Sequence, residues 1–173
     1  MDEKELFKKT EGRLYRYFKG IKERNSLIIE IEGLNRQKKI IAEDIQNTNI
    51  ELEADLNMGI SYGEKVQTSA TGTSYAEQQS IAHINKLQRE LNYINKKLFK
   101  KKAKIREIER NSIALKYNID TLSEDDKQFL EWKYGENKSV DWIATEMFGG
   151  ARTTAYRRRE ELVKNVANWN RLV

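Results

Sequence analysis

The sequence predicts an all-α protein, built as a long antiparallel helical hairpin (coiled coil) followed by a C-terminal domain of three short helices. Among its 173 residues there are no prolines and nine glycines, and no glycine falls between Gly72 and Gly135, so about sixty residues run without a strong helix breaker. Two stretches place apolar residues at alternating steps of three and four, with a glycine- and serine-rich segment between them. Three short segments with helix-capping signals then close the chain.

Composition narrows the class of protein further. Charged residues make up 34% and hydrophobic residues 38% of the chain, which suits long helices with one buried stripe better than a large globular core. The absence of cysteine excludes disulfides, thiolate nucleophiles and cysteine zinc sites, and it is typical of a reducing compartment. No apolar run approaches the roughly 20 residues of a membrane span, and the start "MDEKELFKK" lacks a signal-peptide core. We therefore expect a cytoplasmic protein with no membrane partner, and the net charge of +5 mildly favours a polyanionic one.

The first half of the chain is expected to contain a short helix and the first arm of the hairpin. Residues 1–21 have the pattern of a short amphipathic helix, whose apolar side carries Leu6, Leu14, Tyr17, Phe18 and Ile21. Gly20 is expected to mark a bend after it. The region 22–122 is then expected to form the coiled coil, whose first seam runs through Leu27, Ile31, Leu34, Lys38, Ile41, Ile45, Thr48 and Leu52.

The second arm follows a loop that is expected at about 57–75. Its seam has aliphatic residues at ten of twelve positions, which are Ile84, Leu87, Leu91, Ile94, Leu98, Lys101, Ile105, Ile108, Ser112, Leu115, Ile119 and Leu122. Two heptad helices joined by a loop most simply fold back on each other. Since such a hairpin buries little by itself, a second copy is expected to pair with it. The expected dimerisation seam is Leu87, Leu91, Ile94, Leu98, Ile105 and Ile108. A parallel dimer of one continuous rod is the alternative, and it leaves the break in register at the loop unexplained.

Residues 123–173 have the sequence pattern of a compact helical domain. Ser123 is expected to cap a first helix, with Asp126 at the spacing of a capping box and Gly135 as the stop. Ser139 is expected to cap a second helix with Val140, Ile143, Ala144, Met147 and Phe148 on one stripe. The pair Gly149-Gly150 makes a turn into a third helix that faces inward with Ala155, Leu162, Val163 and Val166. Three short helices with a glycine turn before the last follow the order of a helix-turn-helix domain.

The last helix carries the residues that indicate a function. If Ala155 and Leu162 face the core, the first turns present Arg152, Thr153, Tyr156 and Arg157 outward. Helix N-terminal residues contact base edges in the major groove, and arginine is the usual bidentate reader of guanine. Arg158 and Arg159 lie further along and are assigned to phosphates. Residues 151–173 contain six Arg or Lys and two Glu, which gives a local net charge of +4. A solvated surface helix is the alternative, and the two preceding helices favour DNA contact over it.

Other candidate sites are weaker. The basic stretch "NKKLFKKKAKIRE" from Asn95 to Glu107 is explained as the solubilising outer face of the coiled coil, although a phosphate-tracking surface is the alternative. Lys101 occupies a seam position, where it either snorkels outward or specifies register. His83 is the only histidine and no cysteine accompanies it, so no metal site is expected. The run "SEDD" is best explained by helix capping. With no catalytic constellation or phosphate-binding loop, we expect neither an enzyme nor a cofactor.

The segment "DKQFLEWKYGENKSVDWIATEMFGGARTTAYRRREEL" resembles region four of bacterial sigma factors, and more closely its form in phage late-transcription regulators of the ArpU and RinA type. The resemblance is tight from about 121 to 167, and the upstream order of helix, loop and long helix is also similar. It implies that the third helix enters the major groove and that Arg152, Thr153, Thr154, Tyr156 and Arg157 contact bases and phosphates. The turn "MFGGAR" is one residue longer than the usual sigma-type turn. The residues that contact DNA can therefore be shifted by one position along the helix. A bacterial host cell is implied, and RNA polymerase is a partner by analogy only.

Together these observations predict a dimeric, sequence-specific regulator of phage or prophage transcription that binds double-stranded DNA. The first alternative is a DNA-packaging protein similar to a small terminase subunit, which would assemble as a ring of many subunits. The second alternative is a coiled-coil adaptor whose C-terminal helices bind protein and not DNA.

Overall fold

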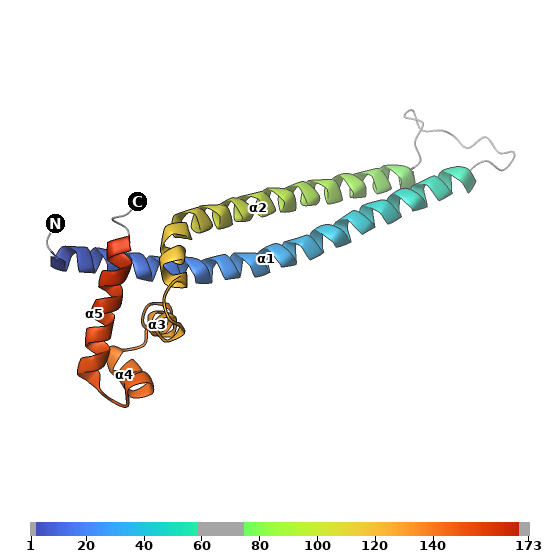
Figure 1. Ribbon diagram of the computed structural model, residues 1–173. Coiled ribbons are helices and arrows are strands. Elements are labelled where there is room, and N and C mark those ends of the chain that lie inside the picture. The colour runs from blue at the N-terminus through green and yellow to red at the C-terminus, as the bar shows by residue number, and fades with distance from the viewer. Residues whose placement is uncertain (1–2, 59–74, 170–173) are drawn as a thin grey trace, which may run out of the picture. The chain divides into compact units, whose positions relative to one another are not determined.

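The computed structural model describes residues 3–58 and 75–169, and all of its regular elements are helical (Figure 1). In chain order these are α1 (Glu3–Met58), α2 (Tyr75–Asp120), α3 (Glu124–Leu130), the π-helical turn η1 (Glu131–Gly135), α4 (Val140–Phe148) and α5 (Arg152–Trp169). The expected all-α class is therefore confirmed. The loop expected at about 57–75 lies outside the described residues except at its two edges. None of the helices in the described ranges is both long and apolar enough to cross a membrane.

The chain divides into two compact units, and both long helices contribute to each of them. Unit 1 comprises residues 1–27 and 104–173, and unit 2 comprises residues 28–103. The expected boundaries were 1–21, 22–122 and 123–173. The difference has a physical cause, because apolar residues near the start of α1 and the end of α2 belong to the same core as the three short helices.

Unit 2 is the hairpin, in which α1 and α2 lie side by side and run in opposite directions (Figure 1). Its core consists of Ile41, Leu87, Ile94 and Leu98, with Ile31, Leu34, Ile45 and Leu91 packed against it. Both sets come from the two predicted seams, so the seams meet within one chain. The side chain of seam member Leu52 is not among the described ones. Lys101 of α2 forms an ion pair with Glu30 of α1. This pair compensates the positive charge that Lys101 places at a seam position.

The expected dimerisation seam therefore has a different role in the structure. Leu87, Ile94 and Leu98 are buried against α1 of the same chain. In unit 1, Ile108 is also buried and Ile105 is half-buried. The buried members of the expected seam are therefore packed within the chain, whereas Leu91 and Ile105 are only half-buried.

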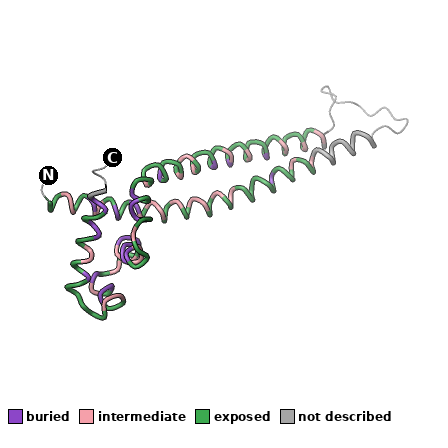
Figure 2. Tube along the Cα trace, in the orientation of Figure 1, coloured by how far each residue is buried: buried purple, intermediate pink, exposed green. Residues whose placement is uncertain are grey.

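The core of unit 1 has buried residues from all six elements, α1, α2, α3, η1, α4 and α5. Figure 2 marks the buried positions along the chain. Its largest fully buried side chains include Phe129, Leu130, Ile143 and Leu162 from the short helices and Leu14 from α1. Leu115 and Ile119 at the end of α2 join the same cluster. Since Leu14 would otherwise face water, the first turns of α1 are an integral part of this unit.

Gly20 does not bend the chain, because α1 continues through it without interruption. A Cβ atom at this position would come within 3.3 Å of Ile108 Cγ2 on α2. The glycine therefore serves a close approach of the two helices in unit 1. The expected separate helix at 1–21 is the first part of one 56-residue helix.

The predicted caps of the short helices are present. Ser123 Oγ accepts from Asp126 N at 3.3 Å, and Ser139 Oγ accepts from Trp142 N at 3.1 Å. The helical segment formed by α3 and η1 ends at Gly135, as expected. A Cβ at Gly135 would meet Phe18 Cδ1 at 3.2 Å, and Asn137 takes the left-handed conformation with φ of 59°. Gly135 is thus needed for close packing, and Asn137 provides the reversal.

The turn between α4 and α5 depends on backbone conformations that favour glycine. Gly149 and Gly150 have φ of 57° and 88°, and Gly150 N donates to Ala144 O at 2.9 Å to close the end of α4. No other residues in the described ranges except Asn137 have positive φ. The turn therefore fixes how α5 leaves α4.

We expect Gly150→Ala to destabilise the protein by about 1–2 kcal/mol, because an L side chain is strained at this φ. Urea unfolding followed by circular dichroism measures the change. Gly12→Ala is the matched control in the same unit, since its Cβ would meet nothing within 4 Å and the position is helical. The control should be stabilising by about 0.5–1 kcal/mol. Equal effects of the two variants would contradict the role assigned to the turn.

Candidate nucleic-acid interface

The first two turns of α5 present a polar, cationic face to solvent. Ala155 is fully buried, and the outward orientation expected for its neighbours is confirmed by their exposure. The exposed residues of this face are Arg152, Thr153, Thr154, Tyr156 and Arg157. Buried Leu162, Val163 and Val166 anchor the later turns of the helix in the core. The exposed face is thus held on a rigid support.

The residue before α5 cannot cap the helix with its side chain. Ala151 precedes the helix and has no side-chain oxygen to cap it, so the first N–H groups have no partner within the helix. Arg152 Nε lies 3.5 Å from Asp141 Oδ1 of α4, and both side chains are largely solvated. This loose pair keeps Arg152 beside the helix start and leaves it free to exchange its partner for a phosphate or a base.

Arg158 has turned toward the core and binds the cap of α3. Its Nε donates to Asp126 Oδ1 at 2.8 Å and its Nη2 to Asp126 Oδ2 at 2.7 Å. The same carboxylate accepts from Ser123 Oγ at 2.8 Å. The hydrogen bonds that Arg158 donates to Asp126 raise the pKa of Arg158, so the guanidinium remains charged. This bidentate pair fixes α5 to the first turn of α3.

Arg159 is held by a carboxylate from the other end of the chain. Its Nε and Nη2 donate to Glu11 Oε1 at 2.9 and 2.6 Å, and Tyr134 Oη donates to the same oxygen at 2.7 Å. The guanidinium also lies 5.4 Å from the ring centroid of Phe7. Burial opposes the charge of Arg159, but the hydrogen bonds with Glu11 and Tyr134 outweigh it and raise its pKa. Glu11 therefore joins α1, η1 and α5 at one point.

The environment of Tyr134 makes the stability of unit 1 sensitive to alkaline pH. Burial raises the pKa of Tyr134 well above its usual range, and the neighbouring Glu11 adds to this shift. A raised folded-state pKa means that the stabilisation is fully present below about pH 10, the ordinary tyrosine value, and is lost as pH rises further. Burial and the charge of Asp120 raise the pKa of Tyr17 in the same direction.

We therefore expect the free energy of unfolding to fall with pH above about 10. Tyr134→Phe should lower stability by roughly 1 kcal/mol at neutral pH through the lost hydrogen bond, and it should flatten the alkaline decline. Thermal unfolding across the alkaline range measures both quantities. Tyr156→Phe, which removes an exposed hydroxyl of α5, is the control and should keep the decline of the parent protein. An unchanged decline in Tyr134→Phe would refute this assignment.

A groove of about 630 Å³ borders the cationic face on one side. Thr154 and Arg157 line it together with four carboxylates, which are Asp125, Asp126, Glu146 and Glu161. Glu160 is also exposed, one turn beyond Tyr156. Asp126 and Glu161 are paired with Arg158. The other two carboxylates, Asp125 and Glu146, repel phosphate, so on α5 itself they favour contact with a polyanion at the first two turns.

Two tryptophans pack against each other where η1 and α4 meet. Trp132 and Trp142 pack edge to face with ring centroids 5.1 Å apart, and Lys138 Nζ lies 4.8 Å from the Trp142 centroid. Trp142 is partly exposed at the first turn of α4. The side chain of Trp169 is outside the described residues. Trp142 is therefore placed to report, by fluorescence, on a ligand bound near the start of α4.

The sequence pattern did not identify the two carboxylates that organise α5. Asp126 was assigned to capping alone, and it caps α3 while also binding Arg158. Glu11 was not singled out, because it lies 148 residues from its partner and no local spacing relates the two. Arg158 and Arg159, expected at phosphates, are instead engaged by these carboxylates. Arg152, Thr153, Thr154, Tyr156 and Arg157 remain together on the open face.

The described residues contain no group of three or more His, Cys, Asp or Glu side chains arranged to hold a metal ion. His83 is exposed on α2. No protein-family model matches the chain, and no curated protein or solved structure is significantly similar to it.

Proposed function

We propose that the chain is a DNA-binding transcription regulator without catalytic activity, in which α4, the Gly149-Gly150 turn and α5 act as a helix-turn-helix unit. One observation supports this proposal most directly. The first two turns of α5 place two arginines, two threonines and a tyrosine in solvent, while the rest of the helix is anchored in a core. The resemblance of residues 126–162 to sigma-factor region four favours the same role.

In this proposal the start of α5 enters the major groove. Arg152 and Arg157 donate to guanine or to phosphates, and Thr153 and Thr154 contact base edges or thymine methyl groups. The uncapped N–H groups at the helix start bind a backbone phosphate. Arg158 and Arg159 act as positioning residues, because their pairs with Asp126 and Glu11 fix the angle of α5.

Sequencing the genomic fragments retained by the purified protein tests the proposal. A regulator of this kind should enrich a defined double-stranded site, and adding that site should change the fluorescence of the tryptophans in a salt-dependent manner. No enrichment, together with unchanged fluorescence at low salt, would instead favour an adaptor that binds protein.

We also propose that the regulator is a homodimer. The hairpin leaves large apolar side chains in solvent, notably Ile29, Ile40 and Phe99 at 67, 56 and 69% exposure, and a second copy would cover part of them. Light scattering should give twice the 20.4 kDa mass of one chain. A ring of many subunits would contradict this proposal and point to a packaging protein.

A further inference from the structure

The hairpin carries a concentration of positive charge that α5 does not account for. The segment from Lys86 to Lys102 contains seven Lys or Arg residues and one carboxylate, Glu90, which gives a local net charge of +6. The net charge of the whole chain is +5, so this part of α2 exceeds the total. A cationic segment of this density on one helix requires either screening by solvent or an anionic partner.

These charges gather on one side of α2. Steps of three and four residues align six exposed side chains, which we call the basic stripe: Lys86, Arg89, Tyr93, Lys96, Lys97 and Lys100. At 1.5 Å per residue the stripe is about 21 Å long. None of its five cations forms an ion pair with a carboxylate among the described side chains. Lys97 Nζ lies 4.4 Å from the ring centroid of Tyr93, so the one aromatic member is also covered by a cation.

The neighbouring surface of α1 does not neutralise the stripe. A groove of about 470 Å³ lies beside it and is lined by Lys97, Lys100 and Lys101 from α2 and by Glu30, Gly33, Leu34 and Gln37 from α1. Glu30, the single carboxylate in this lining, is already paired with Lys101. A Cβ at Gly33 would meet nothing within 4 Å, so the groove is open next to the two stripe lysines.

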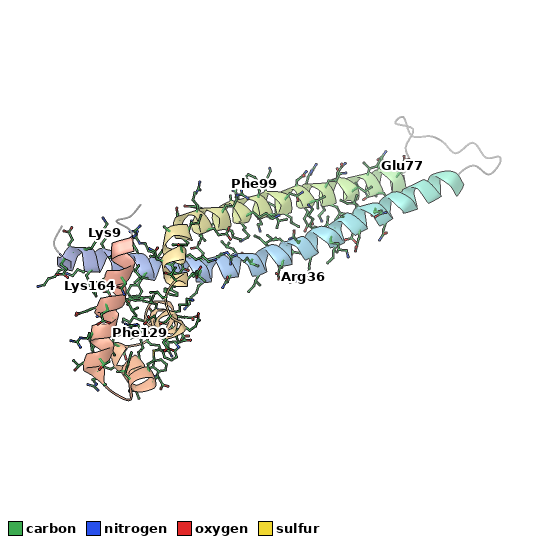
Figure 3. The ribbon with its side chains drawn as sticks, viewed as in Figure 1. Lys9, Arg36, Glu77, Phe99, Phe129 and Lys164 are labelled. Carbon is green, nitrogen blue, oxygen red and sulfur yellow. The ribbon has the colours of Figure 1, made fainter. Side chains whose placement is uncertain are left out.

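We infer that the basic stripe binds the phosphate backbone of a nucleic-acid duplex. Cations that follow one another along a helix match a polyanion whose charges repeat along a line. An anionic membrane is a poorer match, because an interfacial helix needs a free apolar face and that of α2 is covered by α1. Phe99 is exposed, but it lies on the side of α2 turned away from α1 and outside the stripe (Figure 3).

This inference concerns a different unit from α5 and goes beyond the proposed function, on which it depends only for the choice of duplex as the ligand. The stripe would supply affinity that is independent of sequence, whereas α5 would supply selection of the site. The stripe would therefore change the salt dependence of binding and leave the preferred sequence unaltered.

The test compares two full-length triple variants that lose the same charge. The stripe variant is Lys96→Gln/Lys97→Gln/Lys100→Gln, and the matched control is Arg36→Gln/Lys38→Gln/Lys39→Gln on α1. All three control residues are exposed, and Arg36 lies on the side of α1 turned away from α2 (Figure 3). Circular dichroism checks that both variants keep their helix content.

Binding to a labelled duplex of arbitrary sequence is followed by fluorescence anisotropy over a range of salt concentrations. Each lost phosphate contact lowers the slope of log affinity against log salt by about 0.9, so the stripe variant should lose roughly 2–3 from the slope and the control less than about 1. Equal losses in both variants, or an unchanged slope in the stripe variant, would overturn the inference. Equal or tighter binding of the parent protein to vesicles of phosphatidylserine and phosphatidylcholine would overturn it as well.

A background variant separates this inference from the proposed function. In Arg152→Gln/Arg157→Gln the contribution of α5 is removed, and the stripe substitutions should still lower the remaining slope by the same amount. If the background variant binds the enriched site as the parent does while the stripe effect persists, the role of α5 fails and the stripe stands. If the stripe substitutions have no effect in either background, the stripe fails and the role of α5 is unaffected.

Discussion

Arg152→Gln/Arg157→Gln should reduce affinity for the enriched DNA site by about a hundredfold or more, because a bidentate arginine contact with guanine discriminates by about 1–3 kcal/mol. Both side chains are exposed, so their loss should leave the fold intact. Discrimination between the enriched site and unrelated duplex should fall together with affinity. Competition binding with both duplexes measures the two quantities.

The control for this prediction removes two charges elsewhere. Arg36→Gln/Lys39→Gln on α1 should change affinity for the site by less than about tenfold, through long-range electrostatics alone. A similar loss in both double variants would mean that general charge, and not the face of α5, governs binding. The proposed recognition role would then have to be abandoned.

Glu11→Ala should destabilise unit 1 by about 2–3 kcal/mol, because it leaves the guanidinium of Arg159 and the hydroxyl of Tyr134 without their shared acceptor. The side chains of Glu11 and Arg159 are only 15 and 25% exposed, so water replaces the carboxylate poorly. Since the same carboxylate holds α5, affinity for the DNA site should also fall. Thermal unfolding and binding to the enriched site give the two readouts.

Two further variants distinguish an effect on position from a general loss of stability. Glu3→Ala removes the exposed pair with Lys164 near the same end of α1 and should leave both readouts as they are in the parent. Glu11→Gln keeps an acceptor without the charge, and it should recover part of both stability and affinity. If Glu11→Ala bound DNA as tightly as the parent at a temperature where it is folded, the positioning role would be refuted.

Local patterns predicted those parts of the fold that depend on neighbours in sequence. The heptad seams, the caps at Ser123 and Ser139 and the glycine turn each follow from the chemistry of a few adjacent positions. An apolar stripe does not specify what covers it. Each seam could therefore pack against the other arm of the same chain or against a second chain. The structure covers the seams within the chain.

The organisation of unit 1 could not be predicted in the same way. Whether Leu14 continues a coiled coil or enters the core of the short helices depends on contacts between distant segments. The ion pairs of Arg158 and Arg159 also depend on contacts between distant segments. A run of arginines predicts a solvated or phosphate-binding face unless the positions of the opposing carboxylates are known. For the candidate site, the exposed residues were identified and the ones that hold them in place were not.

The division of the two long helices between the units also bears on how the protein can be redesigned. Residues 28–103 interrupt unit 1 as an insertion, and the two segments of unit 1 that flank the insertion are joined by an ion pair of 2.8 Å between Arg24 and Glu109. Matched heptads can therefore be deleted from both arms, or a short linker can replace the whole insertion, while the core around Phe129 stays intact. Truncation at Ser123 should not be tolerated in the same way. Such a fragment would expose the apolar surface that Leu14, Leu115 and Ile119 normally cover.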